Sequence, residues 1–346
     1  MAIRRLLAAG LVAALAAPAL VAGQAAAQRS GRARKPRYVD LRKVPQPKVT
    51  GAEIIAGLED FVERFPLRQQ GMPNNLAAAE FLAEEARDHG FKSRIIEVDT
   101  GGLGPRAKGL VVEAIKRGTT KPDEWIAFIA HYDVVPGAGA TVQGAYDDGS
   151  GTNMLRFFGK AFGKIKTRRS IVLLWFDAEE NGLLTSAAYA QMLAERKQKV
   201  VAGLGFDMVG IGYPARYCIC IYHGPNPTDA LQAEPIIDYV NFDFLDFPQG
   251  DGGAAVTEKW PLGTDPHVCS CGVNIRNSDE QNFARQGYFT LRWTGMRTAA
   301  DYPGYHQPWD TVPFMELVAG GRDLLEQGTE NTFVSAYYTT FVLDNL

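Results

Sequence analysis

The chain has 346 residues, of which 46% are hydrophobic and 22% are charged, and its formal net charge is −3. The segment from Arg29 to Lys48 holds eight lysines and arginines against one acid, so the rest of the chain is more acidic than the total indicates. An acidic body argues against nucleic acid as a partner. Beyond the first residues no apolar run is long enough to span a bilayer, which argues against stable membrane insertion.

The first residues are typical of a secretory signal peptide. Arg4 and Arg5 precede an apolar run over residues 6–22, and small residues follow at 25–27 as a cleavage site. Pro18 interrupts the run, which favours a signal peptide over a membrane anchor. We therefore expect an exported protein, either periplasmic or extracellular.

Three segments are expected from the composition. Residues 1–27 form the signal peptide, residues 28–48 a basic flexible leader, and residues 49–346 a single domain. The leader is rich in lysine, arginine and proline, which is typical of a solvated tail.

Apolar residues at helical spacing predict two amphipathic helices after the leader, at Gly51–Phe65 and Asn74–His89. Six strand-like runs are then expected, at Ser93–Val98, Gly109–Ile115, Trp125–Ala130, Ile171–Phe176, Val200–Phe206 and Tyr288–Trp293. Further helices are expected at Asn153–Phe162, Leu184–Arg196 and Pro313–Leu325. Several of the strand runs are continuously apolar, which indicates strands buried on both faces. The pattern predicts a three-layer α/β/α domain with a central mixed, mostly parallel sheet.

The region from Tyr213 to Ile275 is rich in proline, glycine and aspartate and has weak periodicity, so it is predicted to be an irregular loop region. It contains all four cysteines, in the pairs Cys218/Cys220 and Cys269/Cys271. An even number of cysteines in an exported protein favours disulfides, and two facing Cys-x-Cys segments have the spacing for two adjacent bridges. A zinc site made of all four cysteines is the alternative.

Acids and histidines follow the ends of the predicted strands. His131-Tyr132-Asp133 follows the strand at 125–130, and Glu179-Glu180 follows the strand at 171–176. Asp207 ends the strand at 200–206. In open α/β sheets, ligands bind where the loops at the carboxyl ends of the strands converge. We therefore expect these side chains to line one crevice, together with Asp147 and His306 from later loops.

Each of these residues has an ordinary explanation by itself, such as a turn or a solvated acid pair. Together, two imidazoles and three carboxylates suit two zinc ions that share one bridging carboxylate. The predicted ligands are His131, Asp147, Glu180, Asp207 and His306. Two further acids, Asp133 and Asp310, are placed to accept the other ring proton of a metal-bound histidine.

With these motifs the sequence resembles the co-catalytic di-zinc aminopeptidase family. That family includes secreted bacterial leucyl aminopeptidases and, more distantly, glutaminyl cyclases and glutamate carboxypeptidase. The resemblance extends from about Gly51 to the C-terminus. His131 matches the first ligand in its His-x-Asp motif, Asp147 matches the bridging carboxylate in Asp-Asp-Gly-Ser-Gly, and Glu179-Glu180 match a catalytic base followed by a ligand.

The remaining ligands also match. Asp207 lies in Phe-Asp-Met-Val-Gly, and His306 lies in Tyr-His-x-Pro-x-Asp-Thr. Ser278-Asp279 resembles a family element that usually continues with histidine, whereas Glu280 follows here. This departure affects the expected substrate pocket and no metal ligand.

The resemblance implies an aminopeptidase that removes N-terminal residues from peptides with a free α-amine. A water activated by two zinc ions attacks the scissile carbonyl, and Glu179 takes its proton and passes it to the leaving amine. Tyr305 is placed either to donate a hydrogen bond to the oxyanion or simply to pack beside the site. The resemblance also implies a cis peptide bond between Asp147 and Asp148.

Two other functions stay open at this point. One is glutaminyl-peptide cyclisation with a single zinc ion, since cyclases share the His-Tyr-Asp motif and the double glutamate. Cyclases carry tryptophan where this chain has Tyr305, and an Asp-Asp-His element at Ser278-Asp279, which disfavours this reading. The other is a peptide-binding protein of the same fold without catalysis, whose usual mark is a lost base or ligand.

Overall fold

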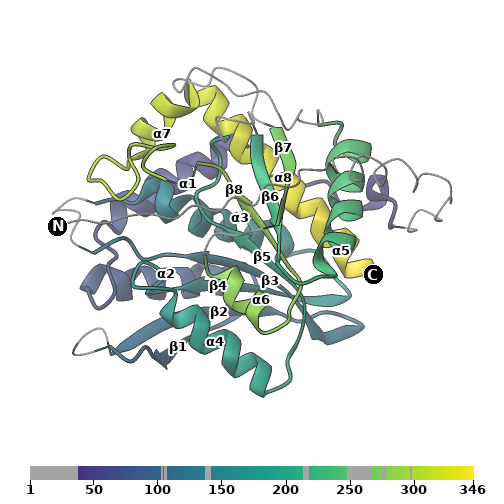
Figure 1. The fold of residues 1–346 in the computed structure, drawn as a ribbon, viewed down its shortest axis with the longest axis horizontal. Helices are drawn as coiled ribbons and strands as arrows, with labels where there is room; N and C mark the ends of the chain where they lie inside the picture. Colours follow the sequence, from purple (N-terminus) through teal and green to yellow (C-terminus); the bar gives the residue numbers. More distant parts are fainter. Residues whose placement is uncertain are drawn as a thin grey trace, which may run out of the picture. The chain divides into compact units, whose positions relative to one another are not determined.

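In the computed structural model, a mixed sheet of eight strands lies between two layers of helices (Figure 1). The structure describes residues 38–102, 104, 107–136, 142–212, 218–247, 267–273, 278–296 and 298–346. The predicted signal peptide lies outside these residues. Residues 38–346 form one structural unit, and the description below concerns that unit.

The sheet has the strand order β1-β2-β4-β3-β5-β8-β6-β7. The strands are β1 (Lys92–Asp99), β2 (Lys108–Lys116), β3 (Lys121–His131), β4 (Arg169–Phe176), β5 (Lys199–Phe206), β6 (Cys218–His223), β7 (His267–Val273) and β8 (Thr290–Thr294). Strands β4, β3, β5 and β8 run parallel to their neighbours in this central row, and β6 pairs in parallel with β7. Strands β1, β2 and β4 pair antiparallel, as do β6 and β8. The predicted mixed, mostly parallel sheet is confirmed.

The helices are α1 (Gly51–Arg64), α2 (Pro73–Asp88), α3 (Ser150–Phe162), α4 (Leu184–Glu195), α5 (Asp229–Ile237), α6 (Glu280–Arg285), α7 (Val312–Ala319) and α8 (Arg322–Asn345). Helices α4 and α6 cover one face of the sheet, and α1, α2, α3 and α8 pack on the other. Strand β3 shows why its sequence is continuously apolar. Its Ala127 and Ile129 face the layer of α4, whereas Phe128 faces the opposite layer, so both faces are buried.

Local sequence explains several helix boundaries. Helix α1 begins at a capping box, in which Thr50 accepts the backbone N–H of Glu53 and the Glu53 carboxylate accepts the N–H of Thr50. The single helix expected at Pro313–Leu325 is instead two helices. Gly320 and Gly321 have positive φ angles of 95° and 136°, a conformation that ends α7 and lets α8 start in a new direction.

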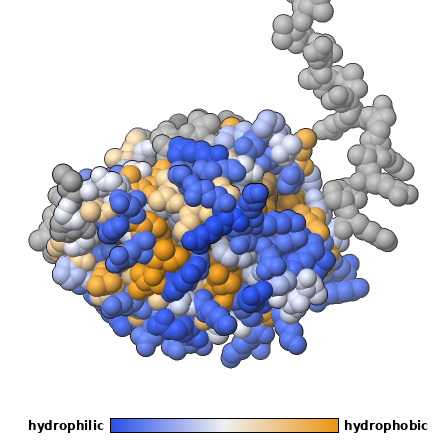
Figure 2. All heavy atoms as spheres, turned by 90° about the horizontal axis from the view of Figure 1, so that it is seen from below, coloured by the Kyte–Doolittle hydropathy of each residue, from blue (hydrophilic) through white to orange (hydrophobic). Residues whose placement is uncertain are grey.

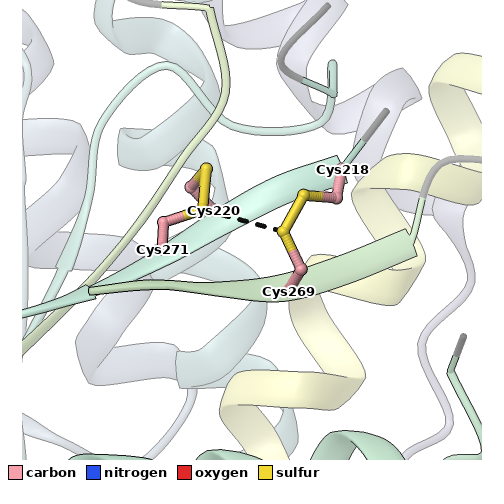
Figure 3. A group of neighbouring side chains, drawn as sticks. All are labelled: Cys218, Cys220, Cys269 and Cys271. Atoms are coloured by element: carbon pink, nitrogen blue, oxygen red, sulfur yellow. Dashed lines mark hydrogen bonds between the residues drawn. A yellow bond between two sulfur atoms is a disulfide. The ribbon is translucent and has the colours of Figure 1, made fainter. Parts of the chain in front are cut away.

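The prediction of an irregular loop region at 213–275 is wrong for its described part. Strands β6 and β7 extend the main sheet there, and α5 lies between them in sequence. Two short strands separated by a long stretch rich in proline and glycine leave little periodicity in any sequence window, which is why the pattern missed them. Their pairing places the cysteines side by side, and the structure contains the disulfides Cys218–Cys269 and Cys220–Cys271 (Figure 3). The predicted disulfides are confirmed.

The C-terminal end of the predicted leader packs on the domain. Asp40 caps a short 3₁₀ helix at Leu41–Lys43, and Leu41 is fully buried. The Tyr337 hydroxyl donates to the carbonyl of Pro45. The leader boundary expected at Lys48 therefore differs from the structure, because an apolar anchor inside a basic segment was not recognised.

On the face shown in Figure 2, hydrophilic residues predominate and areas of hydrophobic residues lie between them. Among the described helices, none has the length and apolar composition needed to cross a bilayer.

Candidate active site

The central parallel strands deliver four of the predicted site residues to one edge of the sheet. His131 is the last residue of β3, and Asp207 directly follows β5. Glu179 and Glu180 follow β4 in a short turn. Because β4, β3 and β5 are adjacent and parallel, their carboxyl ends open at the same edge.

Two loops complete the site. Asp147 lies just before α3, and the peptide bond between Asp147 and Asp148 is cis, as the family resemblance implied. His306 lies between β8 and α7 and has a positive φ of 58°, a backbone conformation that residues other than glycine adopt at some energetic cost. The structure thus brings together all six residues predicted as ligands or base.

Asp147 joins two groups of potential ligands. Its Oδ1 lies 3.2 Å from His131 Nε2, and its Oδ2 lies 3.2 Å from His306 Nε2. His306 Nε2 is also 3.1 Å from Glu180 Oε2. The groups His131/Glu179/Asp207 and Asp147/Glu180/His306 each present side-chain atoms within 4.8 Å of one another. One carboxylate that addresses both histidines has the placement required of a bridging ligand.

The donor set fits zinc. Imidazole nitrogens and carboxylate oxygens are ordinary zinc ligands. Glu180 Oε1 is buried without a hydrogen-bond partner in the described part of the chain, and the other carboxylate oxygen of Glu180 lies 3.1 Å from His306 Nε2. A buried polar atom without a partner is costly, so its place in this cluster of ligand atoms favours a bound cation.

Asp133 lies where its predicted role requires. Its Oδ1 is 3.2 Å from Nδ1 of His131, the ring nitrogen that faces away from Asp147. The Asp133 carboxylate also accepts the backbone N–H groups of Glu179 and Glu180, each at 3.3 Å. One buried carboxylate therefore orients the ring of His131 and fixes the turn that carries the two glutamates.

Asp310 does not serve His306 in the way the sequence suggested. Its Oδ2 accepts the backbone N–H of Asp147, and its Oδ1 accepts both the N–H of Tyr146 and the hydroxyl of Tyr302. The carboxylate therefore holds the loop of the bridging residue. The error arose because the short sequence distance between Asp310 and His306 does not reveal which way the intervening turn faces.

Burial and crowded charge perturb the acids of the site. Burial raises the pKa of Glu180 to about 7, and neighbouring Asp147 adds to the effect. Burial likewise raises the pKa of Asp279 to about 7 and holds that of Glu179 well above its usual value. Burial lowers the pKa of His306, but contacts with Asp147 and Glu180 outweigh it and raise the value to about 10. Such strongly raised pKa values in one cluster of residues are typical of a functional site.

Tyr305 stacks on the ring of His306, with centroids 3.7 Å apart and an interplanar angle of 22°. Burial and the nearby acids, Asp147 first among them, raise the pKa of its hydroxyl, which therefore stays protonated at neutral pH and able to donate. Trp309, three residues after His306, is half exposed at 51%.

Sequence reasoning did not note Arg292, and it noted Glu280 only as a departure from the family element. Arg292 of β8 and Glu280 of α6 are buried, and Arg292 Nη2 lies 2.8 Å from Asp207 Oδ2. An arginine inside the apolar run of β8 was the available signal, because a charge in a doubly buried strand needs a partner.

Comparison with known proteins agrees with this geometry. Residues 111–243 match the model of peptidase family M28, which confirms the family resemblance identified from the sequence. The matched segment includes His131, Asp147, Glu179-Glu180 and Asp207, whereas His306 lies beyond it. Aminopeptidase YwaD of Bacillus subtilis is 27% identical over 186 residues, which are 53% of this chain and 35% of that protein. The match therefore spans only about a third of the curated relative.

Solved structures share the fold. BSAP, a zinc aminopeptidase from Bacillus subtilis, has a TM-score of 0.64 at 13% identity, with 85% of this chain and 96% of that chain covered. The glutaminyl cyclase of Tannerella forsythia has a TM-score of 0.62 at 20% identity, covering 84% and 99%. The fold is therefore that of zinc aminopeptidases and glutaminyl cyclases, and it does not by itself distinguish the two activities.

Proposed function

We propose that the protein is an exported di-zinc aminopeptidase that removes N-terminal residues from peptides. The observation that carries the proposal is the Asp147 carboxylate, whose two oxygens each lie 3.2 Å from a different histidine, with Glu180 beside one of them. The match to peptidase family M28 supports peptide hydrolysis, and the two disulfides are consistent with an oxidising compartment.

His131, Asp147 and Asp207 are proposed to hold one zinc ion, and Asp147, Glu180 and His306 the other. Two bound zinc ions would supply Lewis acidity, which would polarise the scissile carbonyl and lower the pKa of a water molecule so that it can lose a proton and become a nucleophile. Glu179 is proposed as the base. Its carboxylate lies within 3.9 Å of His131 and has a pKa held well above the usual value by burial, so it is suited to accept a proton and release it again.

The other residues orient the reaction. Asp133 fixes the turn of Glu179 and the ring of His131 through the contacts described above. Tyr305 is proposed to donate its hydroxyl hydrogen to the oxygen of the scissile carbonyl as negative charge develops there. The buried acids near Glu180 create a negative environment that would hold the ammonium or amine of a peptide N-terminus. A peptide held there would present its first peptide bond to the attacking water.

The test is a panel of peptides incubated with the zinc-loaded protein and analysed by mass spectrometry. Loss of the N-terminal residue from free peptides, including one with an N-terminal leucine, supports the proposal. Loss of ammonia from a peptide with N-terminal glutamine, without shortening, would indicate a glutaminyl cyclase. Shortening from the C-terminus would indicate a carboxypeptidase, and binding without turnover would indicate a peptide-binding protein.

A further inference from the structure

We infer that Arg292 is a positioning residue that makes the two halves of the metal centre unequal, by holding one oxygen of Asp207 and weakening cation binding at the His131–Asp207 half. The inference rests on the proposed two-zinc site. It concerns the order and affinity of metal loading, which neither the family resemblance nor the donor set determines.

Arg292 reaches the site from beneath. It lies on β8 opposite Gly205 of β5, the strand that ends at Asp207. Its side chain is 4% exposed, and its Nη2 donates to Asp207 Oδ2 at 2.8 Å. Nη1 lies 4.0 Å from Oε1 of Glu280, whose side chain is 2% exposed. The arginine is thus a fixed, buried charge between an acid of the site and an acid behind it.

Glu280 occupies the space that a glycine leaves open. A Cβ atom on Gly205 would lie 2.9 Å from Glu280 Oε2 and 3.0 Å from its Cβ, so the side chain packs directly over the β5 backbone. Glu280 is also the position at which the chain departs from the family element that usually continues with histidine. The departure and Arg292 therefore belong to one arrangement, in which a carboxylate replaces an imidazole and faces a buried guanidinium.

The consequence for Asp207 is that its two oxygens differ. Oδ2 is engaged by Arg292, whereas Oδ1 lies 4.0 Å from His131 Nε2 and faces the ligand group. Asp207 is therefore arranged to bind a cation through one oxygen only. The carboxylates of Asp147 and Glu180 have no lysine or arginine nitrogen within 4 Å, as far as the structure describes the chain, and their ion pairs are with histidines. The buried Arg68 interacts with Asp147 only at longer range, so the half formed by Asp147, Glu180 and His306 has no arginine bonded to one of its carboxylates.

Two effects of Arg292 on the first half oppose each other. An outer partner that orients a ligand typically strengthens metal binding by about 10- to 100-fold. A guanidinium is always charged, however, and in a buried site its repulsion of a divalent cation a few ångströms away is stronger than such an orienting effect. The charge of Arg292 therefore outweighs its orienting effect, and removing that charge should tighten metal binding at the His131–Asp207 half.

The experiment is calorimetric titration of zinc into protein freed of metal by a chelator. The wild type should show a tight and a weak step, and Asp207→Asn should lose the weak one. Arg292→Met should tighten the weak step by about tenfold or more and leave the tight step within about threefold. Arg292→Lys keeps a cation and should keep the weak step weak. Arg322→Met is the matched control, because that arginine pairs with Glu59, Glu316 and Glu326 outside the site.

Equal steps in the wild type, or a weak step that stays the same or weakens in Arg292→Met, would overturn the inference. If thermal melting shows that Arg292→Met does not fold, the variant Arg292→Gln removes the charge but keeps a hydrogen-bond donor beside Asp207 and Glu280, and it carries the same expectation. The proposed function fails separately. If the two zinc-binding steps differ and respond to Arg292→Met as expected, but the protein hydrolyses no peptide, the inference stands and the proposed function fails. If the protein hydrolyses peptides but its two zinc-binding steps are equal, only the inference fails.

Discussion

The carboxylate of Asp310 accepts the backbone N–H of Asp147 at 3.0 Å, so one buried acid fixes the loop that carries the residue between the two ligand groups. Asp310→Asn replaces one acceptor oxygen of the carboxylate with an NH₂ donor, so the Asp147 loop loses a hydrogen bond. Because Asp147 is the proposed bridge, we expect zinc affinity to fall about 10- to 100-fold. Zinc content after dialysis against a weak chelator measures this effect.

Asp344→Asn is the control for that prediction. Asp344 also accepts two consecutive backbone N–H groups, from Arg168 at 2.9 Å and Arg169 at 2.7 Å, but at the C-terminal end of α8. Its variant should lose stability and retain zinc. Equal zinc loss in the two variants would mean that Asp310 acts through general stability and not through the bridge.

The sequence predicted that these side chains come together because several of them lie at strand ends. His131, Glu180 and Asp207 each follow an apolar strand run, and parallel order in the sheet is enough to bring them together. The partners of Asp310 and Arg292 were beyond this reasoning. Asp310 contacts residues more than 160 positions away, and Arg292 contacts Asp207 across 85 positions, and no local pattern encodes such contacts.

In the fold, too, local patterns predicted some elements and long-range contacts determine others. The amphipathic helix α1 and the continuously apolar strand β4 were predicted to within a few residues. Strand β6 has only six residues and lies in a region rich in proline and glycine, so its short run was not distinguished from a loop. Its place beside β8 is set by long-range pairing and the two disulfides.

Glu179 and Glu180 should respond differently to the same substitution. Glu179→Gln removes the proposed base, and we expect activity to fall about 10²- to 10⁴-fold with zinc content unchanged. Glu180→Gln removes a proposed ligand and should lose zinc from its half of the centre. Elemental analysis of both purified variants separates the roles. Zinc loss in Glu179→Gln with retention in Glu180→Gln would reverse the assignment.

The metal-free protein should become less stable as the pH rises. Burial raises the pKa of Glu180 from 4.5 to about 7 and that of Asp279 from 3.8 to about 7. Across this window the unfolded chain has released protons that the folded chain retains, so the free energy of unfolding falls with increasing pH. His306 acts in the same direction, because its raised pKa of about 10 provides stability that is lost as the pH rises from 6.5 through that value.

We therefore expect the melting temperature of the metal-free protein to be lower at about pH 8.5 than at about pH 5.5, and the stabilisation by added zinc to grow over the same range, since ligands must lose their protons to bind. Differential scanning fluorimetry at several pH values, with and without zinc, measures both trends. A metal-free melting temperature that stays constant or rises over this range would contradict the charge arrangement described here.

The disulfides are expected to support stability without affecting the metal centre. Each bridge joins residues 51 positions apart, so Cys220→Ser/Cys271→Ser should reduce the free energy of unfolding by about 2–4 kcal/mol. Urea unfolding under non-reducing conditions measures the loss, with zinc content as the control. Four free thiols in the denatured, unreduced wild type with chelator present would show that the bridges do not form.

The central claim is that the protein hydrolyses the first peptide bond of substrates with a free α-amine. The most direct measurement is kcat/KM for a leucyl peptide and for its N-acetylated form, each with the zinc-loaded enzyme and after chelation. Acetylation removes the charge and the lone pair of the amine and leaves the scissile bond unchanged, so we expect kcat/KM to fall by orders of magnitude. Chelation should abolish hydrolysis, and zinc should restore it. Equal hydrolysis of the two peptides, or hydrolysis that survives chelation, would contradict the account.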